Sequence, residues 1–316
     1  MEPSTKQLQR PAENKDTMAL EIGAVFPTCE IGSDPAAIRD YAQAAEALGY
    51  SHLITYDHVL GAEHAGREPK LMGPYTEGDA FHEPMVLYGF LAACTKKLQL
   101  ATGVLILPQR QTALVAKQAA ELALLSEGRF ILGVGSGWNW VEYEALNEDY
   151  ASRGARLSEQ VEVLRELWSK PLVDFEGDHH RIARANLLPR PTAEIPIWFG
   201  GFSEPAIRRA ARLGDGFLFG LSSPPMQRLC ETLNEALAQN GRAEGFAIDA
   251  ITHFSAGRDG WRSQAETWSG LGATHFSVNS MDTAASLLGN QPVGFKGVED
   301  HIRGLEDFIE TVRDIG

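Results

Sequence analysis

Leu98–Trp138 reads LQLATGVLILPQRQTALVAKQAAELALLSEGRFILGVGSGW, and this stretch decides the fold of the chain. Leu98–Ile106 is almost entirely apolar, which is typical of a strand buried on both faces. Thr112–Ser126 carries small apolar residues spaced along one helical face and is followed by glycine. Phe130–Val134 is a second apolar strand that opens into Gly135-Ser136-Gly137-Trp138. The stretch therefore predicts a β-α-β unit with parallel strands and a right-handed crossover.

The same alternation of short apolar runs and amphipathic segments continues on both sides of this unit. Each predicted strand is followed by a predicted helix, and no linker separates two halves. This pattern favours an α/β fold with a single (β/α)8 TIM barrel over a doubly wound sheet, because eight strands use up the chain without remainder. The predicted strands are 20–26, 52–56, 98–106, 130–134, 197–200, 217–219, 246–254 and 275–278. The predicted helices are 35–48, 83–95, 112–126, 139–147, 156–169, 203–213, 225–240, 260–269 and 298–315.

Two long irregular segments interrupt the alternation, in the loops after the second and fourth strands. Val59–His82 is rich in glycine, proline, histidine and charge, and loops of this length in a compact domain are usually functional. Pro171–Glu194 is expected to contain a short hairpin. The polar leader Met1–Thr17 is expected to be a disordered tail, with the barrel domain formed by residues 18–316.

Composition excludes several classes of function. The 316-residue chain has a formal net charge of −14, which argues against nucleic-acid and membrane-surface binding because both need a basic face. Its three cysteines form no CxxC pair, and no apolar run approaches the length of a membrane span. These features predict a cytoplasmic protein with reduced thiols. Barrel metal sites need paired histidines at the end of the first strand, and this sequence has none there. No metal is expected.

In a barrel of this kind, residues that follow the carboxyl ends of the strands form the active site. Asp57-His58 is an adjacent acid–imidazole pair at such a position, so it is a candidate for proton transfer or, alternatively, a polar cap on the strand. Gly135-Ser136-Gly137 and Gly200-Gly201-Phe202-Ser203 run into helices and expose backbone N–H groups suited to phosphate. For the second turn, which Arg208 and Arg209 follow, the alternative is a plain tight turn.

Aromatic residues gather at the same predicted end of the barrel. Trp198 is expected to pack in the core, whereas Phe26, Trp138, Trp140 and Phe202 together favour a pocket for a flat, largely apolar ligand. The aromatic residues near the strand ends are Phe26, Trp138, Trp140, Trp198 and Phe202.

About two-thirds of the chain resembles the luciferase-like monooxygenase superfamily of flavin and deazaflavin barrels. The matching segments are ALGYSHLITYDH, the stretch Leu98–Trp138, RGARLSEQVEVLRELW and PIWFGGFSEPAIRRAARLGDGF, in the expected order. The resemblance is closest to the subfamily described as probable coenzyme F420-dependent oxidoreductases.

The resemblance implies roles for several of these residues. Asp57-His58 matches the pair that ends the second strand in deazaflavin-using members, whereas FMN-using members usually show a Glu-His-His type sequence there. Thr102-Gly103-Val104 matches a bulge, often with a cis peptide, that presses on the cofactor ring. Gly135–Gly137 matches the loop beside the cofactor side chain, and Gly200–Ser203 matches the phosphate-binding turn.

The resemblance therefore implies an oxidoreductase that moves a hydride between C5 of F420 and an organic substrate. His58 is the candidate for polarising the ring or transferring the proton, with Asp57 orienting it, and Phe26, Trp138 and Trp140 are expected to line the substrate pocket. Sugar-phosphate dehydrogenases of the superfamily carry a carboxylate at the position of Trp138, which argues against glucose 6-phosphate as the substrate.

Two alternatives remain open at this stage. One is an FMN-dependent monooxygenase supplied by a separate reductase, and the other is a barrel that binds a flavin without turnover. A homodimer is the expected assembly, since barrels of this superfamily are often dimers.

Overall fold

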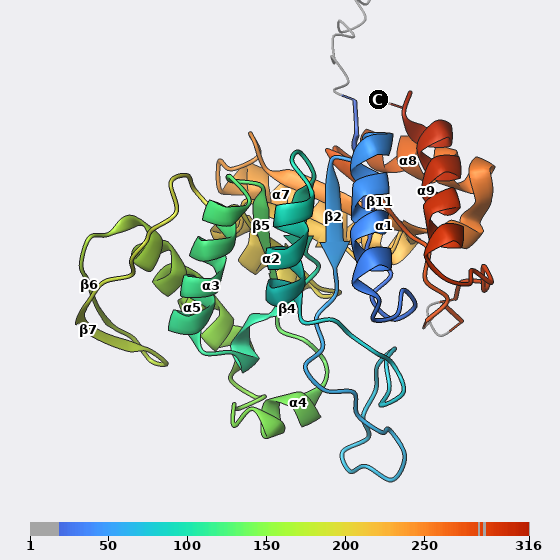
Figure 1. Ribbon diagram of the computed structural model, residues 1–316. Helices are drawn as coiled ribbons and strands as arrows, with labels where there is room; N and C mark the ends of the chain where they lie inside the picture. The colour runs from blue at the N-terminus through green and yellow to red at the C-terminus, as the bar shows by residue number, and fades with distance from the viewer. Residues whose placement is uncertain (1–18, 284, 287–288, 316) are drawn as a thin grey trace, which may run out of the picture.

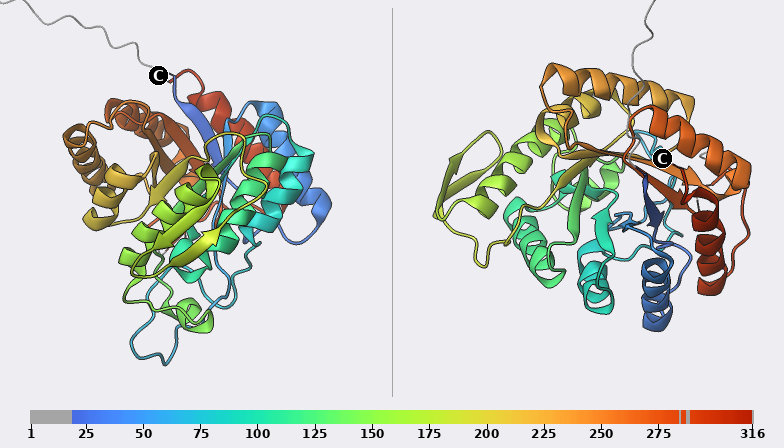
Figure 2. Two further views of the ribbon diagram at one scale, coloured as in Figure 1. Left: turned by 90° about the vertical axis from the view of Figure 1, so that its left-hand side faces the viewer. Right: turned by 90° about the horizontal axis from the view of Figure 1, so that it is seen from above.

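The computed structural model describes residues 19–283, 285–286 and 289–315, and it contains one closed parallel barrel surrounded by helices (Figure 1, Figure 2). The predicted disordered tail Met1–Thr17 lies outside the described residues. The barrel strands are β1 (Glu21–Val25), β2 (His52–Thr55), β3 (Gln99–Thr102), β4 (Leu105–Ile106), β5 (Phe130–Gly135), β8 (Ile197–Gly200), β9 (Gly216–Phe219), β10 (Ala247–His253) and β11 (His275–Asn279).

Parallel pairing closes the barrel. The strand order is β3-β2-β1-β11-β10-β9-β8-β5-β4, and β3 also pairs with β5. The predicted third strand is therefore present as two pieces, β3 and β4, separated by a break at Gly103–Val104. Both pieces pair with β5, with Leu100 opposite Phe130 and Leu105 opposite Val134. The predicted (β/α)8 barrel is confirmed, with β3 and β4 serving as one strand.

Apolar side chains fill the barrel at mid-height, and a polar layer lies below them. The interior cluster contains Val25, Ile54, Ala101, Ile131, Trp198, Leu218, Ile251 and Met281. Nearer the amino ends of the strands, His52 Nε2 lies 2.9 Å from Asp249 Oδ2, and Ser277 Oγ donates to the same carboxylate. These three side chains have no exposed surface, and their hydrogen bonds to one another satisfy polar groups that water does not reach.

Helices pack around the outside of the barrel, as their buried stripes predict. The helices are α1 (Pro35–Leu48), α2 (Pro84–Cys94), α3 (Thr112–Leu125), α4 (Trp140–Ala145), α5 (Arg153–Ser169), α6 (Glu204–Leu213), α7 (Pro224–Gln239), α8 (Gly257–Gly270) and α9 (Val298–Val312). Asp34 caps α1 by accepting from the Ala36 amide at 2.9 Å, and Gly49 ends it with φ of 91°. No helix within the described residues is long and apolar enough to cross a membrane.

Two segments extend beyond the barrel and its surrounding helices. Residues 59–82 form a long loop at the same end of the barrel as α4 (Figure 1). The predicted hairpin in 171–194 is present as antiparallel strands β6 (Val173–Glu176) and β7 (Arg181–Ala185), which project to one side (Figure 1). The loop and α4 lie where the carboxyl ends of the strands open, so they border the candidate site.

Candidate active site

Asp57 follows β2 and lies buried at the barrel mouth. Its Oδ2 accepts from the backbone N–H of Ile106 at 2.9 Å, and its Oδ1 accepts from Arg110 Nη2 at 2.7 Å. Burial raises the pKa of Asp57, and this effect is opposed by the Arg110 guanidinium and the Ile106 amide. Arg110 also donates to Glu83 Oε1 at 3.0 Å. Asp57 therefore joins the end of β2 to β4 and fixes the backbone that follows the break at Gly103–Val104.

His58 is held by a carboxylate from a distant segment. Its Nδ1 lies 3.0 Å from Oε2 of Glu142 on α4, whose side chain is 1% exposed. Oε1 of Glu142 also accepts from the backbone N–H groups of Val59 and Leu60, at 2.6 and 3.1 Å. Because an ionised carboxylate can only accept, Nδ1 of His58 carries a proton and Nε2 is left as the position for proton exchange.

The structure corrects the predicted role of Asp57. Both of its oxygens are engaged by Ile106 and Arg110, and the group that orients the imidazole is Glu142. Arg110 and Glu142 were absent from the predicted site, because they are 53 and 84 residues away from their partners in sequence. The available signal for Glu142 was a glutamate near the start of the predicted helix 139–147, directly after the glycine loop.

Aromatic rings surround His58. The ring centroid of Trp138 lies 5.5 Å from that of His58, and those of Tyr75 and Phe81 lie 5.3 and 4.7 Å away. Gly73 lies on the Trp138 ring, since a Cβ there would be 2.2 Å from the ring carbon Cζ3. The 59–82 loop thus covers the imidazole and the indole together.

The other aromatic residues divide between site and core. Trp140 begins α4, and the guanidinium carbon of Arg67 lies 5.7 Å from its ring centroid. Phe26 has no exposed surface and packs edge-on against Tyr41 of α1, with centroids 5.7 Å apart. We therefore assign Phe26 to the core between the barrel and α1, not to the predicted substrate pocket. Trp198 is 4% exposed inside the barrel, as predicted.

The break between β3 and β4 lies against both predicted glycine loops. Thr102 Oγ1 donates to the Gly133 carbonyl at 2.7 Å, and the peptide bond between Gly103 and Val104 is cis. A Cβ on Gly135 would be 2.4 Å from Val104 Cγ2, and one on Gly200 would be 2.7 Å from Val104 Cγ1. The Val104 side chain therefore fills the space that the missing side chains of Gly135 and Gly200 leave. Three predicted cofactor-binding segments form one continuous surface.

Ser136 and Gly137 continue from Gly135 toward α4. The Ser136 carbonyl accepts from the Tyr143 hydroxyl at 2.7 Å. Gly137 has φ of 60°, a conformation that glycine adopts without strain, and a Cβ there would be 2.8 Å from Ile106 Cγ2. The loop is therefore held close to β4 by backbone and packing that tolerate no side chain.

The turn from β8 into α6 presents backbone donors. No described residue accepts a hydrogen bond from the backbone N–H of Gly201, Phe202 or Ser203, and the Ser203 hydroxyl makes no capping bond. Such N–H groups at a helix N-terminus favour an anion. Phe202 is 63% exposed and its ring lies against Gly220.

The two arginines that follow this turn are engaged elsewhere. Arg208 pairs with Glu204 one turn earlier in α6. Arg209 donates to Ser158 Oγ on α5 at 3.0 Å, and burial together with nearby Arg212 lowers the pKa of Arg209. An anion at this turn would therefore rest on backbone N–H groups and the Ser203 hydroxyl rather than on these two side chains.

Comparison with known proteins identifies the family of this chain. Residues 17–295 match the family described as luciferase-like monooxygenase. The chain therefore belongs to the luciferase-like monooxygenase family.

The individual proteins that are similar to this chain differ in the activity that they are named for. An uncharacterized protein of Mycobacterium tuberculosis is 36% identical over 233 residues, covering 72% of this chain and 80% of the relative. The F420-dependent glucose-6-phosphate dehydrogenase of Segniliparus rotundus is 30% identical over 275 residues, covering 82% of this chain and 74% of the relative. The crystal structure of monooxygenase RslO1 from Streptomyces bottropensis superposes with a TM-score of 0.73 at 19% identity, covering 93% of this chain and 98% of that one. This last similarity is one of fold.

Proposed function

We propose that this chain is an F420-dependent oxidoreductase that transfers a hydride between C5 of the deazaflavin and an organic substrate. One observation carries the proposal: Val104 contacts both glycine loops, while Asp57 ties the end of β2 to β4. One end of the barrel therefore holds the break at Gly103–Val104, the Asp57-His58 pair and the two glycine loops. These are the segments that the family resemblance assigns to the cofactor.

The residues at the mouth fit such a cofactor. Gly135 and Gly200 have no room for a Cβ, so both loops pack directly against Val104 and hold the break at Gly103–Val104 in place. The backbone N–H groups of Gly201, Phe202 and Ser203 are without acceptors among the described residues, and a phosphate supplies acceptors of the right charge. The flat ring would lie against Gly103–Val104, with its phosphate at the α6 turn.

The protein groups then have separable tasks. The bound deazaflavin supplies the hydride chemistry itself. His58, with Nδ1 donating to Glu142, is placed to hold or move a proton at Nε2. Asp57 and Arg110 hold the backbone at Ile106 in place, and the loop that carries Gly73 over Trp138 excludes water from the imidazole.

The choice of F420 over FMN is supported by sequence. The Asp57-His58 pair resembles that of deazaflavin-using members, and a relative at 30% identity is named as an F420-dependent dehydrogenase. Trp138 stands where sugar-phosphate dehydrogenases of the superfamily carry a carboxylate, so we do not extend the named substrate of that relative to this chain.

A fluorescence titration of the purified full chain with F420 and with FMN tests the cofactor. We expect F420 to bind at micromolar concentration or tighter and FMN to bind at least about tenfold more weakly, a gap of about 1.4 kcal/mol. A deazaflavin without the phosphate is the matched ligand control, and it should lose at least about tenfold in affinity if the α6 turn holds the phosphate.

A different result would support either an FMN-dependent monooxygenase or a non-catalytic flavin-binding barrel. Preference for FMN would replace the proposal by a monooxygenase that needs a separate reductase, and oxygen consumption with a reductase would then be measured. F420 binding with no turnover of any acceptor would favour a non-catalytic flavin-binding barrel. The homodimer expected from the family is tested on the same sample by analytical ultracentrifugation.

A further inference from the structure

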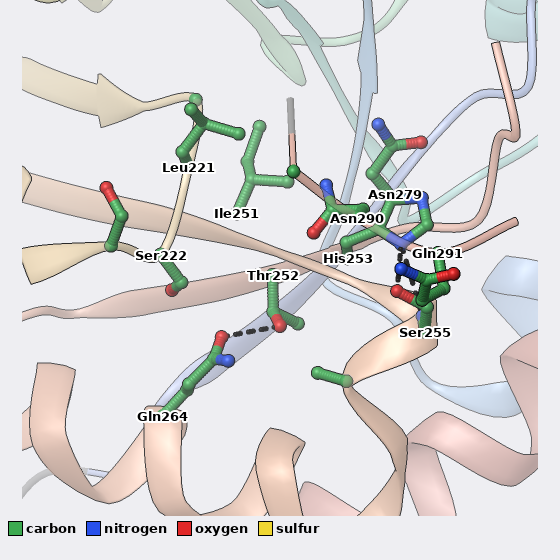
Figure 3. A pocket seen from close by; sticks show the side chains of 14 residues that line it. Leu221, Ser222, Ile251, Thr252, His253, Ser255, Gln264, Asn279, Asn290 and Gln291 are labelled. Atoms are coloured by element: carbon green, nitrogen blue, oxygen red, sulfur yellow. Dashed lines mark hydrogen bonds between the residues drawn. The ribbon is translucent and has the colours of Figure 1, made fainter. Parts of the chain in front are cut away.

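A cavity of about 420 Å³ opens where β9, β10 and β11 end (Figure 3). It is lined by the turn after β9, the end of β10, one residue of α8 and the loop after β11. Its volume is that of a small-molecule site. The lining residues that carry polar side chains are Ser222, Ser223, Thr252, His253, Ser255, Gln264, Asn279, Asn290 and Gln291.

The lining contains hydroxyl and amide groups but no charged side chain. Of the described residues that line it, none is Asp, Glu, Lys or Arg. The imidazole of His253 is bound within the chain: its Nε2 lies 2.9 Å from the Met281 carbonyl and its Nδ1 accepts from the Ser255 amide at 3.2 Å. Since a carbonyl only accepts, Nε2 donates to Met281, and both ring nitrogens are engaged within the chain.

The polar groups in the cavity are able to both donate and accept. Thr252 Oγ1 donates to Gln264 Oε1 at 2.7 Å, which leaves lone pairs on the threonine oxygen and the amide N–H groups of Gln264 (Figure 3). Ser222 Oγ is buried and has no hydrogen-bond partner among the described residues. A buried hydroxyl without a partner costs free energy that a ligand with a complementary group removes.

The cavity borders the barrel interior and the end of β2. Ile251 of the lining belongs to the interior cluster with Ile54, and a Cβ on Gly103 would be 2.2 Å from Ile54 Cγ2. Asn279 Nδ2 lies 3.4 Å from the hydroxyl of Tyr56, the residue before Asp57. The cavity therefore opens at the same end of the barrel as the Asp57-His58 segment, and Asn279 links it to the residue before Asp57.

We propose that this cavity binds the substrate and that the substrate is an uncharged organic molecule bearing a hydroxyl or carbonyl group; the assignment as substrate rests on the proposed function. An anion entering the cavity loses its hydration and meets no opposite charge, which is strongly unfavourable. The net charge of −14 adds a long-range repulsion of the same sign. Hydroxyl and carbonyl groups are instead matched by Thr252, Gln264 and Ser222.

The test compares two matched pairs of probes on the full chain by saturation-transfer NMR. The pairs are glucose with glucose 6-phosphate, and cyclohexanol with cyclohexanecarboxylate. We expect the uncharged member of at least one pair to bind at least about tenfold more tightly than its anionic counterpart. Binding is measured with and without F420, so the result does not depend on turnover.

Substitutions place the binding in the cavity. Ser222→Lys should raise the affinity for the anionic member by at least about tenfold, because it puts a cation where the hydroxyl was. Asn290→Lys is the second variant, used if Ser222→Lys lowers the melting temperature. Ser169→Lys adds the same charge at an exposed position at the end of α5, and it should leave both affinities unchanged.

Four outcomes would overturn the proposal. They are tighter binding of the anionic members, no binding of either member, an equal response to Ser169→Lys, and a loss of F420 affinity in Ser222→Lys that matches the change for the probes. The last would show that the cofactor itself occupies the cavity. If F420 fails to bind while the uncharged probes still bind in the cavity, the proposed function fails and the chemical class of the ligand stands.

Discussion

Glu142 serves two parts of the mouth with one carboxylate. One oxygen accepts from Nδ1 of His58, and the other accepts from the first two amides of the 59–82 loop, Val59 and Leu60. The side chain is 1% exposed, so these bonds are not exchanged for water. Glu142 is a positioning residue: it decides which imidazole nitrogen carries the proton and how the loop begins.

Glu142→Gln is expected to reverse that choice. A glutamine can keep accepting from Val59 and Leu60 through its oxygen, but its amide nitrogen then donates to Nδ1, which moves the ring proton to Nε2. We expect turnover with F420 to fall by about 10²-fold while F420 affinity changes less than about threefold. The ¹⁵N chemical shifts of the His58 imidazole should show the change of tautomer.

Glu144→Gln is the matched control, since it makes the same substitution at an exposed position of the same helix. It should leave turnover and the His58 tautomer unchanged. If Glu142→Gln keeps normal turnover with a changed tautomer, the tautomer of His58 has no part in the reaction.

At this scale the sequence predicts which residues stand at the mouth but not which of them touch. The positions of Asp57 and His58 follow from one strand ending, and adjacency in sequence suggested that one orients the other. Side chains of neighbouring residues at a strand end point in different directions, and here each finds a separate partner, Arg110 and Glu142. Such contacts depend on loop conformation, which local pattern does not encode.

Among the elements, the 59–82 loop is fixed at both ends and in the middle. Glu142 holds its start, and Thr28 Oγ1 accepts from the His82 amide at 3.0 Å at its end. In between, Gly73 lies on the face of Trp138. The length and composition of the 59–82 loop predicted that it is functional. The contact between Gly73 and Trp138 had no signal in the sequence, because neither of the two segments that it joins has a periodic pattern.

Gly73→Ala should lift this loop from the indole. The added Cβ would be 2.2 to 2.4 Å from three ring carbons of Trp138, closer than such atoms approach, so either the loop or the ring has to move. We expect protease cleavage within 59–82 to become about tenfold faster and the tryptophan emission to shift to the red. Circular dichroism should show the barrel intact.

Gly78→Ala is the control in the same loop, because a Cβ there would lie 3.7 Å from Thr76 Oγ1, an ordinary contact. Neither glycine has a positive φ, so the comparison isolates the steric effect. Equal cleavage rates in the two variants would show that Gly73 does not hold the loop on Trp138.

Across the whole molecule, the alternation of apolar runs and amphipathic segments was sufficient to predict the barrel, because eight parallel strands, each joined to the next by a helical crossover, close into one. The helix boundaries differ from the predictions by at most three residues: α1 agrees at both ends, whereas α5 begins at Arg153 instead of 156. The polar layer of His52, Asp249 and Ser277 was not predicted, since each stands within an apolar strand and its partners come from other strands. Long-range pairing of this kind has no local signature.

Two histidines, the half-buried His275 and the buried His301, give the whole barrel a pH-dependent stability. Burial lowers the pKa of His275 from its usual 6.5 to about 4, with nearby His52 adding to the shift and Asp249 opposing it. Burial likewise lowers the pKa of His301 from 6.5 to about 4. Both are neutral in the folded chain, so between pH 6.5 and 4 the unfolded state binds more protons than the folded state, and stability falls as the pH falls through this window.

His275→Phe should therefore flatten the acid side of the stability curve. Each histidine contributes up to about 3 kcal/mol to the loss between pH 6.5 and 4, so the variant should lose about half as much in that window, whatever its stability at pH 7. Urea unfolding at half-unit pH steps measures this, and proton uptake on unfolding near pH 5 should drop by about one. His179→Phe, at an exposed histidine, should keep the slope of the unmodified chain. An unchanged slope in His275→Phe would mean that His275 titrates normally in the fold, and the acid sensitivity would then have to come from His301 and the carboxylates.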